Sequence, residues 1–559
     1  MSKIVKPAFS RKFLNIIIFV CMLMILAFSQ FWSKAEKDFE AQEQAASDQH
    51  NNNLQESDDQ VKASQPVESK PAQTEPAIKA QQTGKALESM QVADFFPELQ
   101  SVPDVPEAEL EFAVESWTTE NGMKALFRQT SAIPMVDIRL VFRAGAAMNT
   151  PEDQGLAQLT SALLGMGADG LNSDDVASGF EALGASFSTG SYQDMALASL
   201  RSLSDAKYLK EGVSLFKKVI SEPTFEMSDF ERQLARRRIA IQQASTSPAE
   251  ILSNAAYARL FPDHPYGREE IGTLDTLNAL KPDAVAEFFE TFYRPRNGVI
   301  ALVGDLSLLD AKKLAEEISR SFSKNKSDQQ APLPQKVKPM AAQSNEPVYI
   351  DFPSQQSHVL LLSRGVERGS KDYYSLYMAN HILGGSGFAS RLNKSIRQDR
   401  GLAYSVGSFV QPMTQTGVFG ISLQTRGDQV EQALDVTQNL IEDFATNGPS
   451  QDEIEFARQQ IISEFFLKIA SNSSQLGYLG SIGFYDLPLD YVEDFQEQIV
   501  KVSPEDVQRV VKKYMLDVMQ ITVVGEAPKE SKAADSSQTT ESKQAKEASS
   551  ANTTSKTRE

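Results

Sequence analysis

The sequence has few of the residues that bind transition metals or form disulfides. Cys21 is the only cysteine among 559 residues, so the chain cannot form an intramolecular disulfide. The histidines number four, and their positions show no metal-ligand spacing: His50, His264, His358 and His381. The sequence therefore offers no metal site built from neighbouring cysteine and histidine residues.

Positive charge is also scarce. The chain has 55 Lys and Arg residues against 74 Asp and Glu residues, which gives a formal net charge of −19. Proteins that bind nucleic acids need a basic surface to contact the phosphate backbone. We therefore predict no nucleic-acid partner.

One long apolar run lies near the N-terminus, at residues 13–32. It has 20 residues and no charge, which is the length of an α-helix that spans a bilayer. Residues 1–12 are basic, so the positive-inside rule predicts a cytoplasmic leader and an anchor in the inner (plasma) membrane. The bulk of the chain would then be periplasmic or otherwise extracytoplasmic. A cleaved signal peptide is the alternative, although this run exceeds the usual 7–15 apolar residues.

Composition divides the remainder of the chain. Residues 33–106 and 528–559 are rich in Gln, Ser, Glu, Lys and Ala, and we expect a disordered tether and a disordered tail there. Two segments with strand and helix patterns, 107–323 and 347–527, are separated by a polar, proline-containing linker at 324–346.

These two segments repeat one another. A helical pattern at 281–293 precedes an apolar strand at 299–305, and a similar pattern at 503–514 precedes a strand at 521–526. The repeat period is about 221 residues, which indicates duplicated domains rather than a solenoid. Strands mixed with long helices predict an α+β fold, in which each of two homologous domains packs helices on a mostly antiparallel sheet.

The segment 154–167 has the apolar spacing of an amphipathic helix. Gln158, Ser161 and Ala162 are spaced i, i+3 and i+4, so they share one helix face. Two histidines on such a face can bind zinc, and a glutamate between them can act as a general base. An amide, a hydroxyl and a methyl group do not form a zinc ligand set.

This segment resembles the zinc helix of the pitrilysin/insulinase family, which includes the mitochondrial processing peptidases. The family helix reads Gly-Leu-Ala-His-x-x-Glu-His. Residues 155–157 match its start, whereas Gln158 and Ala162 replace the two histidines and Ser161 replaces the glutamate. The third ligand of the family is a Glu on a later helix, and here no acidic residue lies between Glu231 and Glu250. The resemblance implies no cofactor in this chain.

A second motif also resembles this family. Arg397 and Tyr404 lie within Arg-Gln-Asp-Arg-Gly-Leu-Ala-Tyr, which matches the family pattern Arg-x-x-x-Gly-Leu-x-Tyr. In active members the Arg and Tyr contact the substrate backbone beside the zinc. A guanidinium and a phenol can both hydrogen-bond a carbonyl oxygen that becomes negative. The alternative is that the pair only fixes a helix–strand junction.

Two further patterns have structural interpretations. The glycine cluster at 384–387 lacks the spacing of a phosphate-binding loop and predicts a turn between two helices. We interpret four arginines as a solvated helix face: Arg232, Arg236, Arg237 and Arg238.

The resemblance covers residues 107–525 and implies two domains that form a half-clam around an extended peptide. Some members work as two subunits, one with the zinc motif and the other with the Arg/Tyr pair. The leading hypothesis is a membrane-anchored, zinc-free subunit whose partner is a zinc-bearing homologue, with zinc in that partner. The alternative is a non-proteolytic peptide-binding or scaffold protein with the same fold. A peptidase that is active alone is disfavoured by Gln158, Ser161 and Ala162.

Overall fold

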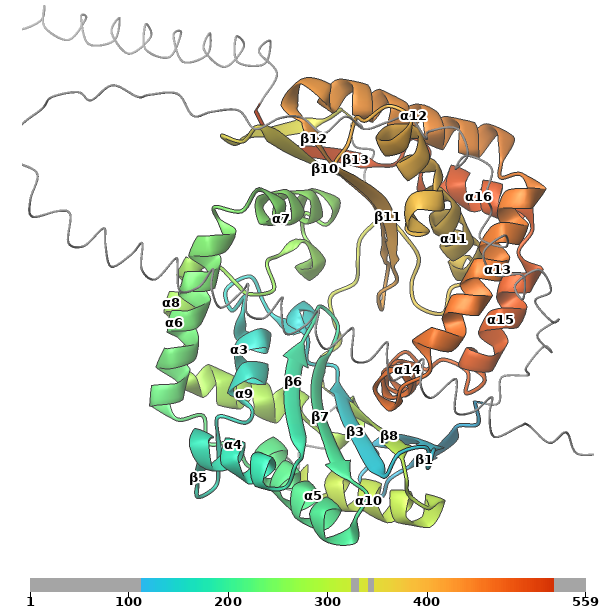
Figure 1. Ribbon diagram of the computed structural model, residues 1–559. Helices are drawn as coiled ribbons and strands as arrows, with labels where there is room; N and C mark the ends of the chain where they lie inside the picture. The colour runs from blue at the N-terminus through green and yellow to red at the C-terminus, as the bar shows by residue number, and fades with distance from the viewer. Residues whose placement is uncertain (1–111, 323–330, 340–345, 527–559) are drawn as a thin grey trace, which may run out of the picture. The chain divides into compact units, whose positions relative to one another are not determined.

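The computed structural model describes residues 112–322, 331–339 and 346–526 (Figure 1). All of these residues belong to one compact unit of the chain. The predicted leader (1–12), membrane span (13–32), tether (33–106) and tail (528–559) lie outside the described residues. No helix within the described ranges is long and apolar enough to cross a bilayer.

The first sheet has six strands in the order β1-β2-β8-β3-β7-β6. Only the pair β2–β8 is parallel. The strands are β1 (Glu115–Thr118), β2 (Lys124–Gln129), β3 (Met135–Phe142), β6 (Ser186–Ser191), β7 (Ala196–Leu203) and β8 (Gly298–Gly304).

The second sheet has the order β11-β12-β10-β13-β9, and only its pair β9–β13 is parallel. Its strands are β9 (Val348–Asp351), β10 (Gln356–Arg364), β11 (Ser405–Gln411), β12 (Val418–Arg426) and β13 (Gln520–Gly525). Apart from β1, the two sheets have the same strand order when β2, β3, β6, β7 and β8 are matched to β9 through β13 in sequence. A short pair, β4 (Gly167–Ala168) and β5 (Leu171–Asn172), lies apart from both.

Helices cover these sheets, so the predicted α+β class is confirmed. Those between β3 and β9 are α3 (Leu156–Leu163), α4 (Ser173–Ala182), α5 (Ala206–Ser221), α6 (Met227–Ala244), α7 (Pro248–Leu260), α8 (Leu274–Ala279), α9 (Pro282–Phe292) and α10 (Leu308–Ser321). Those after β10 are α11 (Tyr373–Asn380), α12 (Val430–Asn447), α13 (Gln451–Lys468), α14 (Asn472–Phe484), α15 (Tyr491–Lys501) and α16 (Pro504–Tyr514). Seven short helical turns complete the described chain: η2 (Ala146–Met148), η3 (Pro265–Gly267), η4 (Pro295–Asn297), η6 (His381–Gly385), η7 (Gly387–Ala389), η8 (Asn393–Gln398) and η9 (Gly427–Gln429).

The central strands are apolar on both faces, so each sheet needs cover on two sides. Along β8, Val299 and Val303 belong to one hydrophobic cluster, while Ile300 and Leu302 belong to another. Along β10, Val359 and Leu361 belong to the first of these clusters, while Leu360 and Leu362 belong to a third.

Each sheet obtains part of its cover from a helix of the other half of the chain. Helix α14 packs on β3 and β8 of the first sheet, and α7 packs on β10 and β13 of the second. Arg259 of α7 donates to the carbonyl of Ile521 at 2.6 Å, and Arg128 of β2 donates to Gln475 of α14 at 3.1 Å. This exchange of helices joins both sheets through shared apolar cores.

Candidate functional site

Helix α3 carries the three positions where the sequence predicts a degenerate metal site. It begins after Gly155, and its buried residues include Leu156, Leu159 and Leu163. Gln158 and Ala162 are partly exposed, whereas Ser161 is 2% exposed and lies beside the buried phenol of Tyr293. Burial raises the pKa of that phenol. Position 161 therefore faces the interior, and only 158 and 162 border accessible space.

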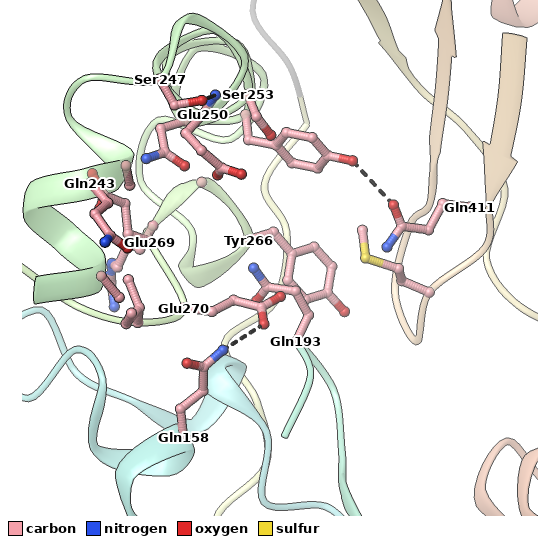
Figure 2. Close-up of a pocket in the computed structure, with 18 residues that line it drawn as sticks. Gln158, Gln193, Gln243, Ser247, Glu250, Ser253, Tyr266, Glu269, Glu270 and Gln411 are labelled. Carbon is pink, nitrogen blue, oxygen red and sulfur yellow. Dashed lines mark hydrogen bonds between the residues drawn. The ribbon is translucent and has the colours of Figure 1, made fainter. Parts of the chain in front are cut away.

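Gln158 is held by a loop that lies between η3 and α8. Its Nε2 donates to a carboxylate oxygen of Glu270 at 3.2 Å (Figure 2). Burial raises the pKa of Glu270, and Asp194 adds to this effect, whereas the hydrogen bond from Gln158 opposes it. The carboxylate is therefore held in a desolvated position, where it accepts a hydrogen bond from the amide of Gln158.

Two glycines bring this loop against α3. Gly155 and Gly272 have φ angles of 93° and 86°, which side chains rarely allow. A Cβ atom at Gly155 would lie 2.5 Å from the carbonyl oxygen of Ile271. The hydroxyl of Thr276 donates to the carbonyl of Gln154 at 3.0 Å. The backbones therefore approach so closely that Glu270 can reach Gln158.

Arg237 of α6 contacts the same helix. Its Nη2 donates to the carbonyl oxygen of Gln158 at 2.8 Å, and its Nη1 donates to Oε1 of Gln233 at 3.1 Å. Burial lowers the pKa of Arg237 to about 10. The interpretation of residues 232–238 as a solvated face was therefore wrong for Arg237, because this guanidinium points into the protein and satisfies a helix carbonyl.

A cavity of about 690 Å³ opens beside Gln158. Its wall includes the carboxylates of Glu250, Glu269 and Glu270, and Figure 2 shows these side chains around the space. Burial raises the pKa of Glu269, and Glu250 adds to the effect. On the far wall, Tyr257 donates to Gln411 of the second sheet at 3.1 Å. Residues from both halves of the chain therefore enclose a polar cavity.

The residues on α3 do not fit a zinc ion. Zinc in proteins takes Cys, His or carboxylate ligands, and α3 offers an amide, a buried hydroxyl and a methyl group. Arg237 adds a positive charge at the backbone of the same helix. Within the described ranges, no three His, Cys, Asp or Glu side chains lie where they could hold a metal together.

Arg397 and Tyr404 lie away from this cavity. Arg397 is at the end of η8 and exposed, with its guanidinium 5.3 Å from the ring centre of Phe388. Tyr404 immediately precedes β11 and is 55% exposed. The backbone secures this junction, because the amide of Gly401 donates to Arg397 and that of Tyr404 donates to Gln424. Neither side chain makes a hydrogen bond or an ion pair within the described part of the chain.

Several residues around α3 could not be predicted from the sequence. Glu270 and Tyr257 lie far from α3 in sequence and carry no recognisable motif. Helical spacing could have distinguished Arg237 from the neighbouring arginines, because it lies four residues after the buried Gln233 and therefore on the same helix face. The glycine cluster at 384–387 lies between α11 and η8, but Gly384 and Gly385 end the helical segment η6 and Gly387 begins η7, so the predicted simple turn is reduced to Ser386.

Comparisons with known proteins place these features in a family. The family model described as insulinase (peptidase family M16) matches residues 124–274, and the model described as peptidase M16 inactive domain matches residues 279–461. An uncharacterized zinc protease of Streptomyces coelicolor is 25% identical over 429 residues, which cover 75% of this chain and 91% of that protein. The non-peptidase homolog YmxG of Helicobacter pylori is 22% identical over 390 residues, which cover 69% of this chain and 88% of that protein.

Solved structures have the same fold. A crystal structure described as a peptidase M16 inactive domain, from Pseudomonas fluorescens, is 35% identical with a TM-score of 0.70 and covers 74% of this chain and 98% of that one. The structure of a Helicobacter pylori protease is 18% identical with a TM-score of 0.69 and covers 74% of this chain and 100% of that one.

Proposed function

Because this chain belongs to the insulinase (M16) family of peptidases, as an inactive-type homologue, we propose that it is the zinc-free subunit of a two-subunit peptidase. Its partner would be a zinc-bearing homologue, and the pair would cleave peptides bound in an extended conformation. The chain itself would bind no metal. Residues 13–32 would anchor it in the inner membrane, with the folded part on the extracytoplasmic side.

The exposure of the Arg/Tyr pair carries this proposal. A side chain that only fixes a helix–strand junction would form hydrogen bonds with neighbouring residues, as the backbone amides of Gly401 and Tyr404 do. The side chains of Arg397 and Tyr404 instead project from the surface. Their donors therefore remain available for a group that another molecule brings to them.

These donors suit a carbonyl group under attack. A carbonyl oxygen gains negative charge as a tetrahedral intermediate forms, and aligned donors stabilise that charge. The phenol of Tyr404 and the guanidinium of Arg397 can each donate to such an oxygen. The partner would supply the zinc, which activates the attacking water.

The test uses the full chain co-expressed with a zinc-bearing homologue. Tyr404→Phe removes one hydroxyl from an exposed position, so assembly and the zinc content of the partner should not change. Peptide turnover should fall by about 10²–10³, as for the loss of one transition-state donor. Tyr208→Phe is the matched control, because Tyr208 is 37% exposed on α5 and outside the site. Turnover that is equal for both variants would refute the catalytic role.

A non-proteolytic binding or scaffold role is the second candidate, and the name non-peptidase homolog given to the Helicobacter pylori relative favours it. Under this alternative, the chain would use the same fold to bind peptides without cleaving them, and Tyr404→Phe would not affect the activity of any co-purified peptidase. The two candidates therefore predict opposite results in one assay.

A further inference from the structure

A second cavity, of about 560 Å³, adjoins the one beside Gln158 and shares Gln193, Glu270, Gln411 and Met413 with it. Its walls come from β3, β7, the β11–β12 connection and α14. Two arginines, Arg139 and Arg368, line it. Apolar side chains on the same walls include Met195 and Leu197, which are both partly exposed.

Arg139 lies in the middle of β3 and is partly buried. Its Nε donates to the hydroxyl of Ser199 at 3.0 Å. The nearest acid on its own strand, Asp137, is bound instead by Arg201, at 2.7 and 3.2 Å. Burial lowers the pKa of Arg139. Within the described residues, this guanidinium is therefore desolvated without an ion pair.

Arg368, the second arginine of this cavity, lies among tyrosines. Its guanidinium carbon is 5.9 Å from the ring centre of Tyr373 and 5.4 Å from that of Tyr485. Burial acts to lower its pKa, but the surrounding tyrosines, which include Tyr491, outweigh burial and raise it. The Nε atom is buried and has no hydrogen-bond partner in the described structure. The charge of Arg368 is thus retained, and one donor is unused.

The two carboxylates on this wall are already engaged. Asp194 accepts from the hydroxyl of Tyr266 at 2.5 Å and from the amide of Thr414 at 2.9 Å. Glu270 accepts from Gln158. Because neither carboxylate forms an ion pair with Arg139 or Arg368 in the described structure, these arginines can bind a carboxylate of another molecule.

We propose that this cavity binds a carboxylate of the peptide ligand on Arg139 and Arg368, with an adjacent apolar residue against Met195 and Leu197. The carboxylate can be an acidic side chain or the C-terminus of the peptide, since both offer the same oxygens. This inference rests on the proposed function only in that the ligand is a peptide. It names the class of peptide selected: one with a carboxylate beside an apolar residue.

The test measures binding of fluorescein-labelled peptides to the full chain without any partner subunit, by fluorescence anisotropy. Four peptides are otherwise identical and carry either Glu or Gln beside a Leu, each with a free or an amidated C-terminus. The uncharged peptide (Gln, amidated) should bind about tenfold or more weakly than the best carboxylate peptide, which corresponds to one charge-assisted hydrogen bond. The Glu/amide and Gln/acid peptides separate the side-chain source from the C-terminal source.

Arg139→Gln and Arg368→Gln should remove this preference, whereas Arg320→Gln should keep it. Arg320 is an exposed arginine of α10 that pairs with Glu120 outside the cavity. Equal binding of all four peptides, or no binding of any, overturns the inference, and this comparison uses the unaltered protein and so does not depend on the folding of a variant. Since no turnover is measured, the result is independent of the Tyr404→Phe experiment.

Discussion

The contact between α14 and the first sheet can be tested with a single methyl group. Gly477, Gly480 and Gly483 follow one another at intervals of three along α14 and face that sheet. A Cβ at Gly483 would overlap the side chain of Val299 and lie 2.6 Å from Cδ1 of Leu126. A Cβ at Gly477 would meet only Nη1 of Arg139, at an ordinary 3.7 Å. Gly483→Ala should therefore destabilise the protein relative to Gly477→Ala.

The size of the difference follows from two terms. Replacing Gly by Ala in a helix interior contributes about 1 kcal/mol of stability through propensity, and this gain is common to both variants. Overpacking a filled core costs about 1–3 kcal/mol, and it applies only at position 483, because Val299 is a stiff β-branched residue in a central strand. The free energy of unfolding should therefore differ between the variants by about 1–3 kcal/mol.

Equilibrium unfolding in urea, followed by circular dichroism, measures this difference through the midpoint concentration. Gly477→Ala should match or exceed the unaltered protein, and Gly483→Ala should unfold at a lower urea concentration than Gly477→Ala with an unchanged slope. Equal midpoints for the two variants would refute the close packing of α14 on β8.

Three further predictions concern the site, pH and topology. The triple variant Gln158→His, Ser161→Glu, Ala162→His should bind zinc only weakly by elemental analysis and competition with a chelator, because the Glu that supplies the third ligand of the family from a later helix is missing and Arg237 holds a positive charge at this helix; tight equimolar zinc would contradict this. Burial acts to raise the pKa of Asp372, but hydrogen bonds from Lys513, Arg509 and Tyr514 outweigh it and lower the pKa to about 2, so this carboxylate stabilises the fold above about pH 4 and loses its contribution as the pH falls toward 2. Asp372→Asn should lower the free energy of unfolding by about 1 kcal/mol at pH 7, a value reduced for solvent screening of the half-exposed partners, and by almost nothing at pH 2. Urea unfolding at both pH values measures this difference, and an equal loss of stability at both would show that the charge of Asp372 is not responsible. The full-length protein should stay in the membrane fraction after a carbonate wash and be cleaved by protease added from the extracytoplasmic side, whereas a mature N-terminus after Ser29 would show a cleaved signal.

Strands and helices with strong periodicity were predictable from the sequence. The expected strand at 299–305 corresponds to β8, and the helical pattern at 281–293 corresponds to α9. Their residues alternate or repeat with the period of the element, so local pattern and final structure agree. The common helix face of Gln158, Ser161 and Ala162 was also predictable, since it depends only on helix geometry.

The environment of these residues was not predictable, because it depends on contacts between distant segments. Ser161 shares a helix face with Gln158, yet Tyr293 covers Ser161 and leaves Gln158 partly exposed. An apolar stripe shows that a helix is buried but not which sheet it covers, so the sequence did not reveal that α7 and α14 each pack on the sheet of the other half. For the same reason, neither cavity could be predicted.

The exchange of α14 has a consequence for synthesis on the ribosome. The strands of the first sheet are all made once Gly304 has emerged, but the helix that covers one of its faces ends at Phe484. Until then the nascent chain exposes apolar side chains such as Leu126, Val141 and Val299, which belong to the core shared with α14. Exposed apolar surface on incomplete sheets promotes aggregation and chaperone binding during folding. The first half should therefore remain incompletely folded and dependent on chaperones until the second half has been synthesised. A chain truncated after residue 330 should accumulate as insoluble protein.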